Sequence, residues 1–424
     1  MNDCECGVTS SLGALSTWRA PLRCCLWLAA LLASPLPVLA QLALTTAAIT
    51  QYEYNSNLFA LPKPLLPGFS LPGGSSSYGD SFVAYGGKVD ASYLWSEQQF
   101  FATVQGNEVD FDRFTQIDHS DYALDGGWDW KLGRLWDGIL DVTRTRTMVA
   151  FYNVVGTNLV MQTEQRETGR ASLQFTPDWR AEFTGVTREV DQPEPPAAPD
   201  LSLCESSGQA AIKYVGTAGV TSGLTVSYLD GNFAGASALL APSYTQTSVG
   251  LTATDEVTGL STFRGQIGYT RRSSESGINN LSGLTGELDY KRTLTGKTTA
   301  ELDLTRQFSA YLTNTGSVVD SVAALTVNWQ ATSKIGVVVG YNFDYRQLPE
   351  QGDAPLGSER TDRLNFASLA MTYVPVPWLM LQPYAHYQER SSRNFIGGDF
   401  NSSVVGLQFA LQWQRGVIPL RNPL

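Results

Sequence analysis

The sequence predicts an all-β protein: a transmembrane antiparallel up-and-down β-barrel of about eighteen strands with a polar lumen. Three observations predict this fold. Hydrophobicity alternates with a period of two along most of the chain, the connections alternate between short and long, and the tryptophans gather beside the short connections. A period of two gives each strand one apolar and one polar face. Because backbone groups in lipid must pair within the protein, a sheet that crosses a membrane has to close.

The stretch Tyr122–Thr147 shows the alternation most clearly, in two halves that a turn at Gly133–Arg134 separates. In the first half every second residue is apolar or glycine, whereas the residues between them include Asp125, Asp129 and Lys131. A hairpin of a soluble sandwich can show the same pattern. The repetition of this unit along the chain and the placement of the tryptophans favour the membrane barrel.

Eighteen strand candidates can be marked by this alternation, with no sustained helical period between them. They are 44–59, 80–95, 99–112, 120–132, 135–147, 163–176, 179–190, 205–216, 223–233, 243–254, 261–272, 281–291, 298–308, 317–330, 335–347, 361–373, 378–390 and 400–413. Because the pattern over 205–233 is weak, a barrel of sixteen strands stays open. An even number of strands with alternating connections places short turns in the periplasm and longer loops outside.

All eight tryptophans beyond the first 40 residues lie near a short connection or the end of the last strand candidate. They are Trp95, Trp128, Trp130, Trp136, Trp179, Trp329, Trp378 and Trp413. We expect them to form a girdle at one membrane interface, because an indole ring is apolar while its N–H prefers water. A second girdle at the long-connection side is expected from other aromatics, namely Tyr52, Tyr54, Phe82, Phe111, Phe308, Tyr345 and Tyr387.

Residues 1–40 have the pattern of a secretory signal peptide. Arg19 and Arg23 precede the short apolar run Cys24–Ala33, and small residues lead to a cleavage site near Ala40–Gln41. The apolar run is shorter than the roughly 20 residues that a membrane-spanning helix needs. The leader and the barrel together predict export to the outer membrane of a Gram-negative cell.

Residues 41–424 are then expected to form one barrel domain, with strands over about 44–413 and a short tail at 414–424. The formal net charge of the chain is −11. This charge argues against nucleic acid as a partner, because neutralising phosphates requires a basic surface. The partner that the pattern itself requires is outer-membrane lipid.

The sequence offers little for catalysis, and we predict that the protein is not an enzyme. His119-Ser120-Asp121 are adjacent, whereas the members of a catalytic triad meet from separate elements, so we expect a solvated outer loop there. The other histidine, His386, is expected to be a hydrogen-bonding group of the lumen. Because only Cys204 follows the leader, no cysteine-based metal site is expected. We predict no catalytic residue, no metal and no cofactor.

Charged residues on the polar faces of the strands are candidates for the lumen wall. Four aspartates of one hairpin could form a carboxylate ladder near the periplasmic mouth, and an ordinary solvated wall with Lys131 as their partner is the alternative. Walls that carry charge of one sign bias which solutes enter. The lumen-lining candidates are Asp125, Asp129, Lys131, Asp137, Asp141, Arg264, Glu287, Asp289, Glu301, Asp303, Asp344, Arg346 and His386.

Two short segments carry a resemblance to a known family. The first strand candidate runs into Asn57-Leu58-Phe59-Ala60-Leu61-Pro62, and Pro177-Asp178-Trp179-Arg180 forms a later turn. Both resemble the outer-membrane β-barrel proteins of exopolysaccharide biosynthesis operons, in the group called β-barrel porin type 2. The resemblance implies a part in exopolysaccharide export or biosynthesis, with polysaccharide and periplasmic export components as partners. One departure is the C-terminal end, where Trp413 is not the final residue.

Two functions therefore stay open. The resemblance implies exopolysaccharide export, in which the barrel provides or organises a polar path across the outer membrane. The barrel alone is sufficient for the alternative, a general or solute-selective diffusion porin. An outer-membrane enzyme has the least support. For either main function it matters whether a long connection, such as Ala60–Gly79 or Met148–Gln162, folds into the lumen.

Overall fold

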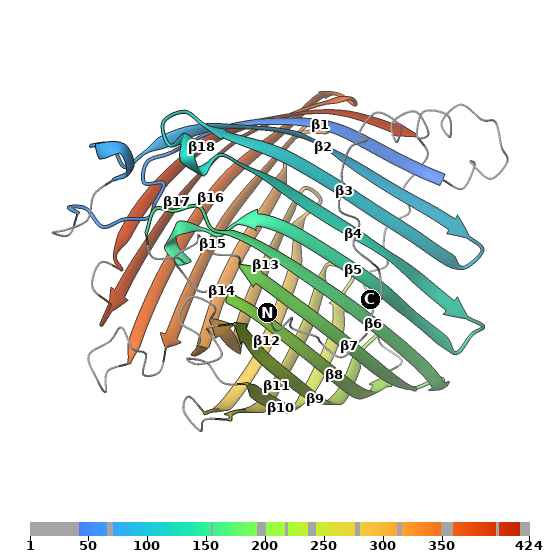
Figure 1. Ribbon diagram of the computed structural model, residues 1–424. Coiled ribbons are helices and arrows are strands. Elements are labelled where there is room, and N and C mark those ends of the chain that lie inside the picture. Colours follow the sequence, from blue (N-terminus) through green and yellow to red (C-terminus); the bar gives the residue numbers. More distant parts are fainter. Residues whose placement is uncertain are drawn as a thin grey trace, which may run out of the picture.

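The computed structural model describes residues 42–65, 71–153, 156–192, 201–216, 219–235, 243–275, 280–311, 316–348, 359–395 and 398–415. They form one antiparallel sheet in which each strand pairs with its neighbours in sequence. The sheet closes because β1 (Leu42–Asn55) also pairs with β18 (Phe400–Arg415) along their length. Figure 1 shows the resulting barrel.

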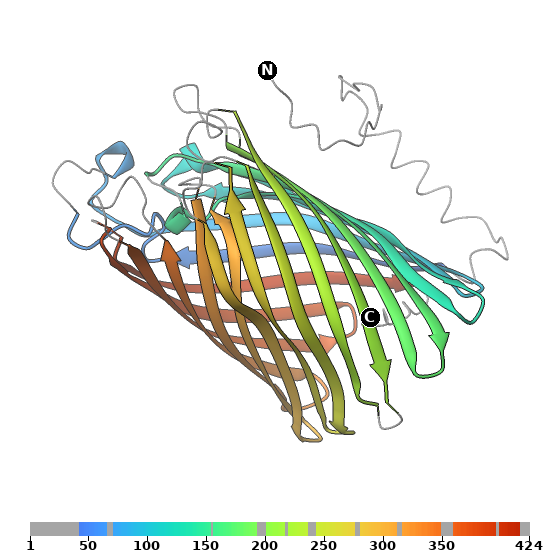
Figure 2. The same ribbon diagram turned by 90° about the horizontal axis from the view of Figure 1, so that it is seen from below.

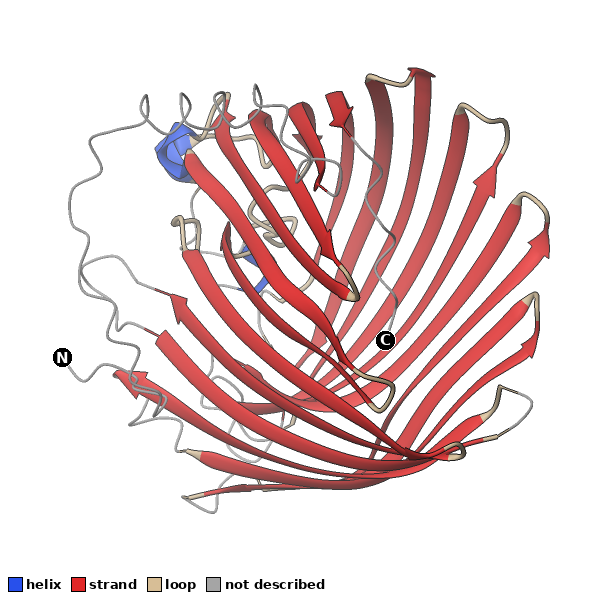
Figure 3. Cartoon of the chain, turned by 90° about the vertical axis from the view of Figure 1, so that its right-hand side faces the viewer, coloured by secondary structure: helices blue, strands red, loops and turns tan. Residues whose placement is uncertain are grey.

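The remaining strands follow in chain order. They are β2 (Asp80–Trp95), β3 (Gln98–Phe111), β4 (His119–Leu132), β5 (Trp136–Met148), β6 (Met161–Thr176), β7 (Trp179–Gln192), β8 (Leu201–Val215), β9 (Thr221–Gly235), β10 (Tyr244–Thr258), β11 (Ser261–Ser274), β12 (Leu281–Thr295), β13 (Thr298–Tyr311), β14 (Gly316–Gln330), β15 (Ile335–Leu348), β16 (Arg360–Val376) and β17 (Leu379–Arg393). The described ranges also contain the 3-10 turns η2 (Pro72–Gly74), η3 (Thr115–Ile117) and η4 (Phe151–Asn153). Figure 3 shows the helical turns in blue beside the red strands.

The fold confirms the predicted all-β barrel and its eighteen strands. The sixteen-strand alternative is wrong, because β8 and β9 pair from Leu201↔Gly235 to Val215↔Thr221 and both continue the sheet. Figure 2 shows the strands running obliquely, with short turns at one end and longer connections at the other. The predicted signal peptide and the tail beyond 415 lie outside the described residues. Within the described ranges no helix is long and apolar enough to cross a bilayer.

Apolar side chains cover one face of the sheet and are exposed there. Val226, Val249, Tyr269 and Leu284 are directly opposed on β9 to β12 and are 46, 49, 56 and 62% exposed. Exposing such a continuous apolar surface to water would be unfavourable, and lipid is the environment that accepts it. The protein is therefore an outer-membrane barrel of a Gram-negative cell, with this apolar band facing the bilayer.

The strands extend beyond the apolar band toward the long connections. They contain 13 to 17 residues, whereas a tilted strand needs only about 9–11 residues to cross a bilayer. Near the long connections the outward positions become charged and exposed, as at Glu108, Arg144, Arg271 and Glu389. These charges indicate where the apolar band ends and where the wall projects into water.

The eight tryptophans lie at the short-connection end. Six are exposed, namely Trp95, Trp136, Trp179, Trp329, Trp378 and Trp413. Trp128 is half-buried and stacks on Phe100 across the strand pair, with ring centroids 5.7 Å apart. Trp130 lies over Gly138, where an added Cβ would be 2.3 Å from the indole ring. We propose that these rings mark the periplasmic membrane interface.

The expected second girdle is wrong for three phenylalanines. Phe111 and Phe308 are 4 and 7% exposed, and Phe82 packs with a buried cluster at the barrel mouth. Tyr345 is half-buried. Tyrosines instead dominate the exposed aromatics toward the long connections, because their hydroxyl groups reach water at a membrane interface. These exposed tyrosines are Tyr52, Tyr54, Tyr85, Tyr228, Tyr269, Tyr341 and Tyr387.

Candidate functional site

The strand register places all thirteen lumen-lining candidates on the face opposite the apolar band. Arg264, Asp289 and Asp303, for example, are directly opposed on β11, β12 and β13. This face is the inner one, because Arg346 on it contacts a connection that crosses the mouth. Arg264 and Glu287 are exposed there, so solvent reaches the inner wall.

The four aspartates of the β4–β5 hairpin share the inner face. Opposed pairs along the hairpin are Asp125 with Thr143 and Lys131 with Asp137. The ion pair of Asp137 is formed with Arg180 of β7, at 2.5 Å between carboxylate oxygen and Nη2. The sequence suggested Lys131 as the partner of these aspartates, but Asp137 forms its ion pair with Arg180 instead. From Arg180 the charged network continues through Glu182 and Lys213.

Asn57 turns the chain inward at the long-connection end. The predicted first strand reached residue 59, but β1 ends at Asn55. The Asn57 side chain is buried, donates from Nδ2 to the carbonyl oxygens of Leu61 (2.8 Å) and Asn401 (2.9 Å), and accepts from the Leu61 N–H. A buried amide with these bonds is a stable corner. It directs the following residues away from the barrel wall.

An apolar cluster, which we call the mouth cluster, fills the space that these residues enter. Phe59 lies at its centre, 1% exposed, with its ring edge-to-face against Phe114 (4.8 Å) and Phe151 (4.7 Å). The connections β1–β2, β3–β4 and β5–β6 all contribute to it, together with the inner faces of β3 and β18. Its buried members are Leu58, Phe59, Ala60, Leu61, Leu71, Val109, Phe111, Phe114, Ile117, Phe151 and Phe400.

A buried carboxylate holds the β3–β4 connection against this cluster. Asp80, 3% exposed, accepts the backbone N–H groups of Arg113 and Phe114. The expectation of a solvated outer loop at His119 is wrong. The His119 side chain is 5% exposed, begins β4, and lies 2.8 Å (Nδ1) from the Ile117 carbonyl oxygen. It stabilises the mouth as part of the folded wall.

The β5–β6 connection crosses the lumen through the turn Phe151–Asn153, which we call the strut. Asn153 Oδ1 accepts a hydrogen bond from Arg346 Nη1 (3.2 Å), and the Tyr152 carbonyl accepts one from Arg390 Nη1. Around the barrel, β5 and β15 are separated by seven strands in one direction and nine in the other. The strut therefore joins nearly opposite walls and narrows the opening.

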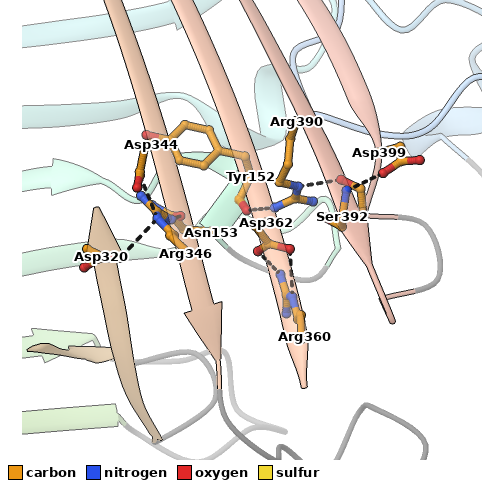
Figure 4. A network of polar contacts seen from close by, with 11 residues as sticks. Tyr152, Asn153, Asp320, Asp344, Arg346, Arg360, Asp362, Arg390, Ser392 and Asp399 are labelled. Atoms are coloured by element: carbon orange, nitrogen blue, oxygen red, sulfur yellow. Dashed lines mark hydrogen bonds and ion pairs between the residues drawn. The ribbon is translucent and has the colours of Figure 1, made fainter. Parts of the chain in front are cut away.

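The wall that receives the strut is a network of arginines and aspartates on β14 to β17 (Figure 4). Asp320, Arg346 and Asp362 are directly opposed in one row, and Arg346 Nε lies 2.8 Å from Asp344. Arg360 forms two hydrogen bonds to Asp362, at 3.1 and 2.7 Å. We call this group the arginine wall, and its guanidinium groups are engaged by protein partners.

A second group of buried polar contacts lies at the long-connection ends of β10, β11, β13 and β14. Arg272, 2% exposed, donates from Nη2 to the Phe308 carbonyl (3.1 Å) and from Nη1 to Ser317 Oγ (3.3 Å). Its guanidinium lies over the Tyr244 ring at 4.2 Å, and the Tyr244 hydroxyl donates to Glu205. Arg272 of β11 thereby holds the ends of β13 and β14.

Sequence reasoning found Asp344 and Arg346 but missed Arg360, Asp362 and Arg390. Their spacing could have indicated Arg360 and Asp362, because residues two apart on a strand share a face and this pair lies beside a long connection. His386 lies on the inner face, 5.1 Å from the Phe366 ring. Within the described ranges, no group of three or more His, Cys, Asp and Glu side chains is arranged to hold a metal ion.

Comparisons with known proteins add the following. No protein-family model matches the chain, and no curated protein matches it. The resemblance to exopolysaccharide operon barrels therefore has no support from these comparisons. The solved outer membrane protein OpdK from Pseudomonas aeruginosa aligns with a TM-score of 0.46 and 10% identity, covering 87% of this chain and 99% of that chain.

Two further solved structures align similarly. OccK2 (OpdF) from Pseudomonas aeruginosa has a TM-score of 0.47 and 11% identity, covering 87% of this chain and 98% of that chain. A BenF-like porin from Pseudomonas fluorescens Pf-5 has a TM-score of 0.46 and 10% identity, covering 88% and 99%. Likenesses of this degree carry no argument about function. The closed eighteen-stranded β-barrel is established by the strand pairings of this chain itself.

Proposed function

We propose that this protein is a solute-selective diffusion porin, a passive path for small hydrophilic solutes across the outer membrane. The observation that carries the proposal is the solvent-exposed polar inner wall of a closed eighteen-stranded barrel, narrowed at the outer mouth by the strut and the mouth cluster. A barrel of this strand number is wide enough for a water-filled lumen. The narrowing would limit the size of the solutes that pass.

Reconstitution tests the proposal directly. The purified full chain, added alone to a planar lipid bilayer, is expected to give steady ion conductance and to admit small neutral solutes in liposome-swelling assays. No partner protein is required, because the path lies within one closed barrel. A chain that inserts and resists heat as a folded barrel, yet conducts no ions, would overturn the porin.

Exopolysaccharide export, which the sequence resemblance implied, is the competing function. A polymer would have to pass the strut, which is anchored to the far wall through Arg346 and Arg390. This anchoring favours the porin. A strain that lacks the gene is therefore expected to secrete normal amounts of exopolysaccharide while its uptake of small solutes falls. Loss of the polymer with unchanged uptake would reverse the assignment.

The aspartate ladder makes a prediction about ion selectivity. Changing Asp125, Asp129, Asp137 and Asp141 together to Asn is expected to lower the ratio of cation to anion permeability, because carboxylates in a confined lumen attract cations. The measurement is the reversal potential in a salt gradient. The substitutions also take the Asp137 carboxylate away from Arg180, which keeps only its contact with Glu182, and this change shifts the ratio in the same direction.

The matched control is the double variant E108Q/D110N, which removes two exposed carboxylates on the outward face of β3. It should leave the permeability ratio unchanged, because these groups do not face the lumen. If the fourfold variant also keeps the original ratio, the ladder is an ordinary solvated wall.

A further inference from the structure

An aromatic side chain is exposed on the inner wall just below the mouth. Among the described inner-face side chains of the strands, Phe366 is the one aromatic that is exposed, at 36%. Phe366 is directly opposite Asn342 of β15 and Gln388 of β17. Arg390, two residues after Gln388 on β17, lies on the same face. Other phenylalanines of the mouth region, such as Phe59 and Phe400, are buried in packed clusters. A ring left in contact with lumen water indicates a surface that a ligand can cover.

Two more rings continue this surface toward the periplasm. His386 lies 5.1 Å from Phe366, and Tyr384 lies 6.5 Å from His386 with the two planes only 8° apart. Tyr384 and His386 are two residues apart on β17 and therefore share the inner face. The three rings, which we call the aromatic track, form a continuous series along the direction in which a solute would travel.

The position of Tyr384 is fixed by its neighbours. Its ring lies over Gly406 of β18, where an added Cβ would be 2.3 Å from the ring, so a side chain at that position would displace it. Its hydroxyl donates to Glu53 Oε2 (2.5 Å) and accepts from Gln51 Nε2 (2.7 Å). Because the Tyr384 ring is already held in place, less conformational entropy is lost when a ligand binds to it.

Polar groups border the aromatic track on both sides. Gln388 and Asn342 flank Phe366, and Ser368 is directly opposite His386. Amides and hydroxyls are neutral groups that can both donate and accept hydrogen bonds. The nearest carboxylate, Glu53, is engaged by Tyr384. Aromatic rings flanked by neutral amides and hydroxyls are suited to a ligand that has an apolar face and hydroxyl groups around its edge.

We propose that the aromatic track is a binding site for a neutral oligosaccharide, whose pyranose rings stack on Phe366, His386 and Tyr384 during passage. The C–H face of a pyranose covers the aromatic rings while its equatorial hydroxyls bond the amides of Asn342 and Gln388. This inference rests on the proposed diffusion function and names its substrate class. Anionic solutes are disfavoured, because the chain is acidic and the guanidinium groups of the arginine wall are engaged.

The test measures the block of ion current by sugar. Maltohexaose, a linear neutral glucose hexamer, is titrated against the purified full chain in a planar bilayer. The original protein is expected to show a saturable block. F366A should weaken the apparent affinity about tenfold, the loss expected when one ring no longer covers apolar surface of the ligand. F366W, which keeps an aromatic face, should retain the block.

The matched control is Y387A, which removes the outward-facing neighbour of His386, 42% exposed toward lipid. Its sugar block should equal that of the original protein. A conducting channel that neither maltohexaose nor cellohexaose blocks would overturn the oligosaccharide site and leave the porin standing. Equal sugar affinity of F366A and Y387A would overturn it as well. Failure of the porin itself would appear as absent current before any sugar is added.

Discussion

F59A is expected to open the outer mouth and raise the single-channel conductance. Phe59 is 1% exposed at the centre of the mouth cluster and contacts rings of two other connections. Removing a buried phenylalanine side chain typically costs about 3–5 kcal/mol. The loss falls on connections that are not part of the sheet, so the barrel should persist while the strut loses its packing. Liposome swelling should then admit larger solutes than the original protein does.

The control for F59A is F183A, which removes a phenylalanine that is 53% exposed on the outward face of β7. This variant should keep the original conductance and size limit. Unchanged conductance in F59A, with the folded barrel intact, would mean that the mouth cluster does not limit the path. The resistance of both variants to heat in detergent shows whether the sheet itself has survived.

L251R and T252R are expected to differ strongly in stability although they are adjacent on β10. Leu251 is 60% exposed on the outward face, opposite Leu224 and Ile267. An arginine on the lipid face costs roughly 2–4 kcal/mol at the bilayer midplane. Thr252 lies on the inner face, where water can solvate the guanidinium. Reversible unfolding by denaturant in lipid vesicles measures the two free energies.

T252R serves as the matched control for L251R, since it adds the same side chain one residue away. It should unfold at nearly the original denaturant concentration and change ion selectivity instead. Equal destabilisation by the two substitutions would contradict the assignment of the two faces. The pair thereby tests both the lipid band and the water-filled lumen in one strand.

The arrangement of the barrel wall between the short connections and the mouth can be predicted from the local sequence pattern alone. The period of two fixes which residues share a face, and hairpin connections fix which strands are neighbours. This is why Asp125 and Asp137 could be placed on one face from the sequence. The ion-pair partner of Asp137 could not be placed in this way, because Arg180 reaches Asp137 from a strand that is two positions further around the barrel.

The mouth shows where the pattern misleads. Apolar residues continue past Asn55 through Leu58 and Phe59, so the alternation predicts a longer first strand. The chain instead leaves the wall, because Asn57 gains hydrogen bonds to Leu61 and Asn401 and Phe59 becomes buried among rings of other connections. The segment that resembles exopolysaccharide operon barrels thus has a structural role here, as the corner that narrows the opening.

The sequence by itself determined the wall of this protein: its strands, its two faces and the lipid band, all of which depend on residues two apart or on adjacent hairpins. Only the tertiary structure decided the opening. Arg346 meets Asn153 from nearly opposite walls, and Tyr384 of β17 donates to Glu53 of β1 across the closing strand β18. Such contacts depend on the closure of the barrel and on the direction in which each connection folds, and no local periodicity records either.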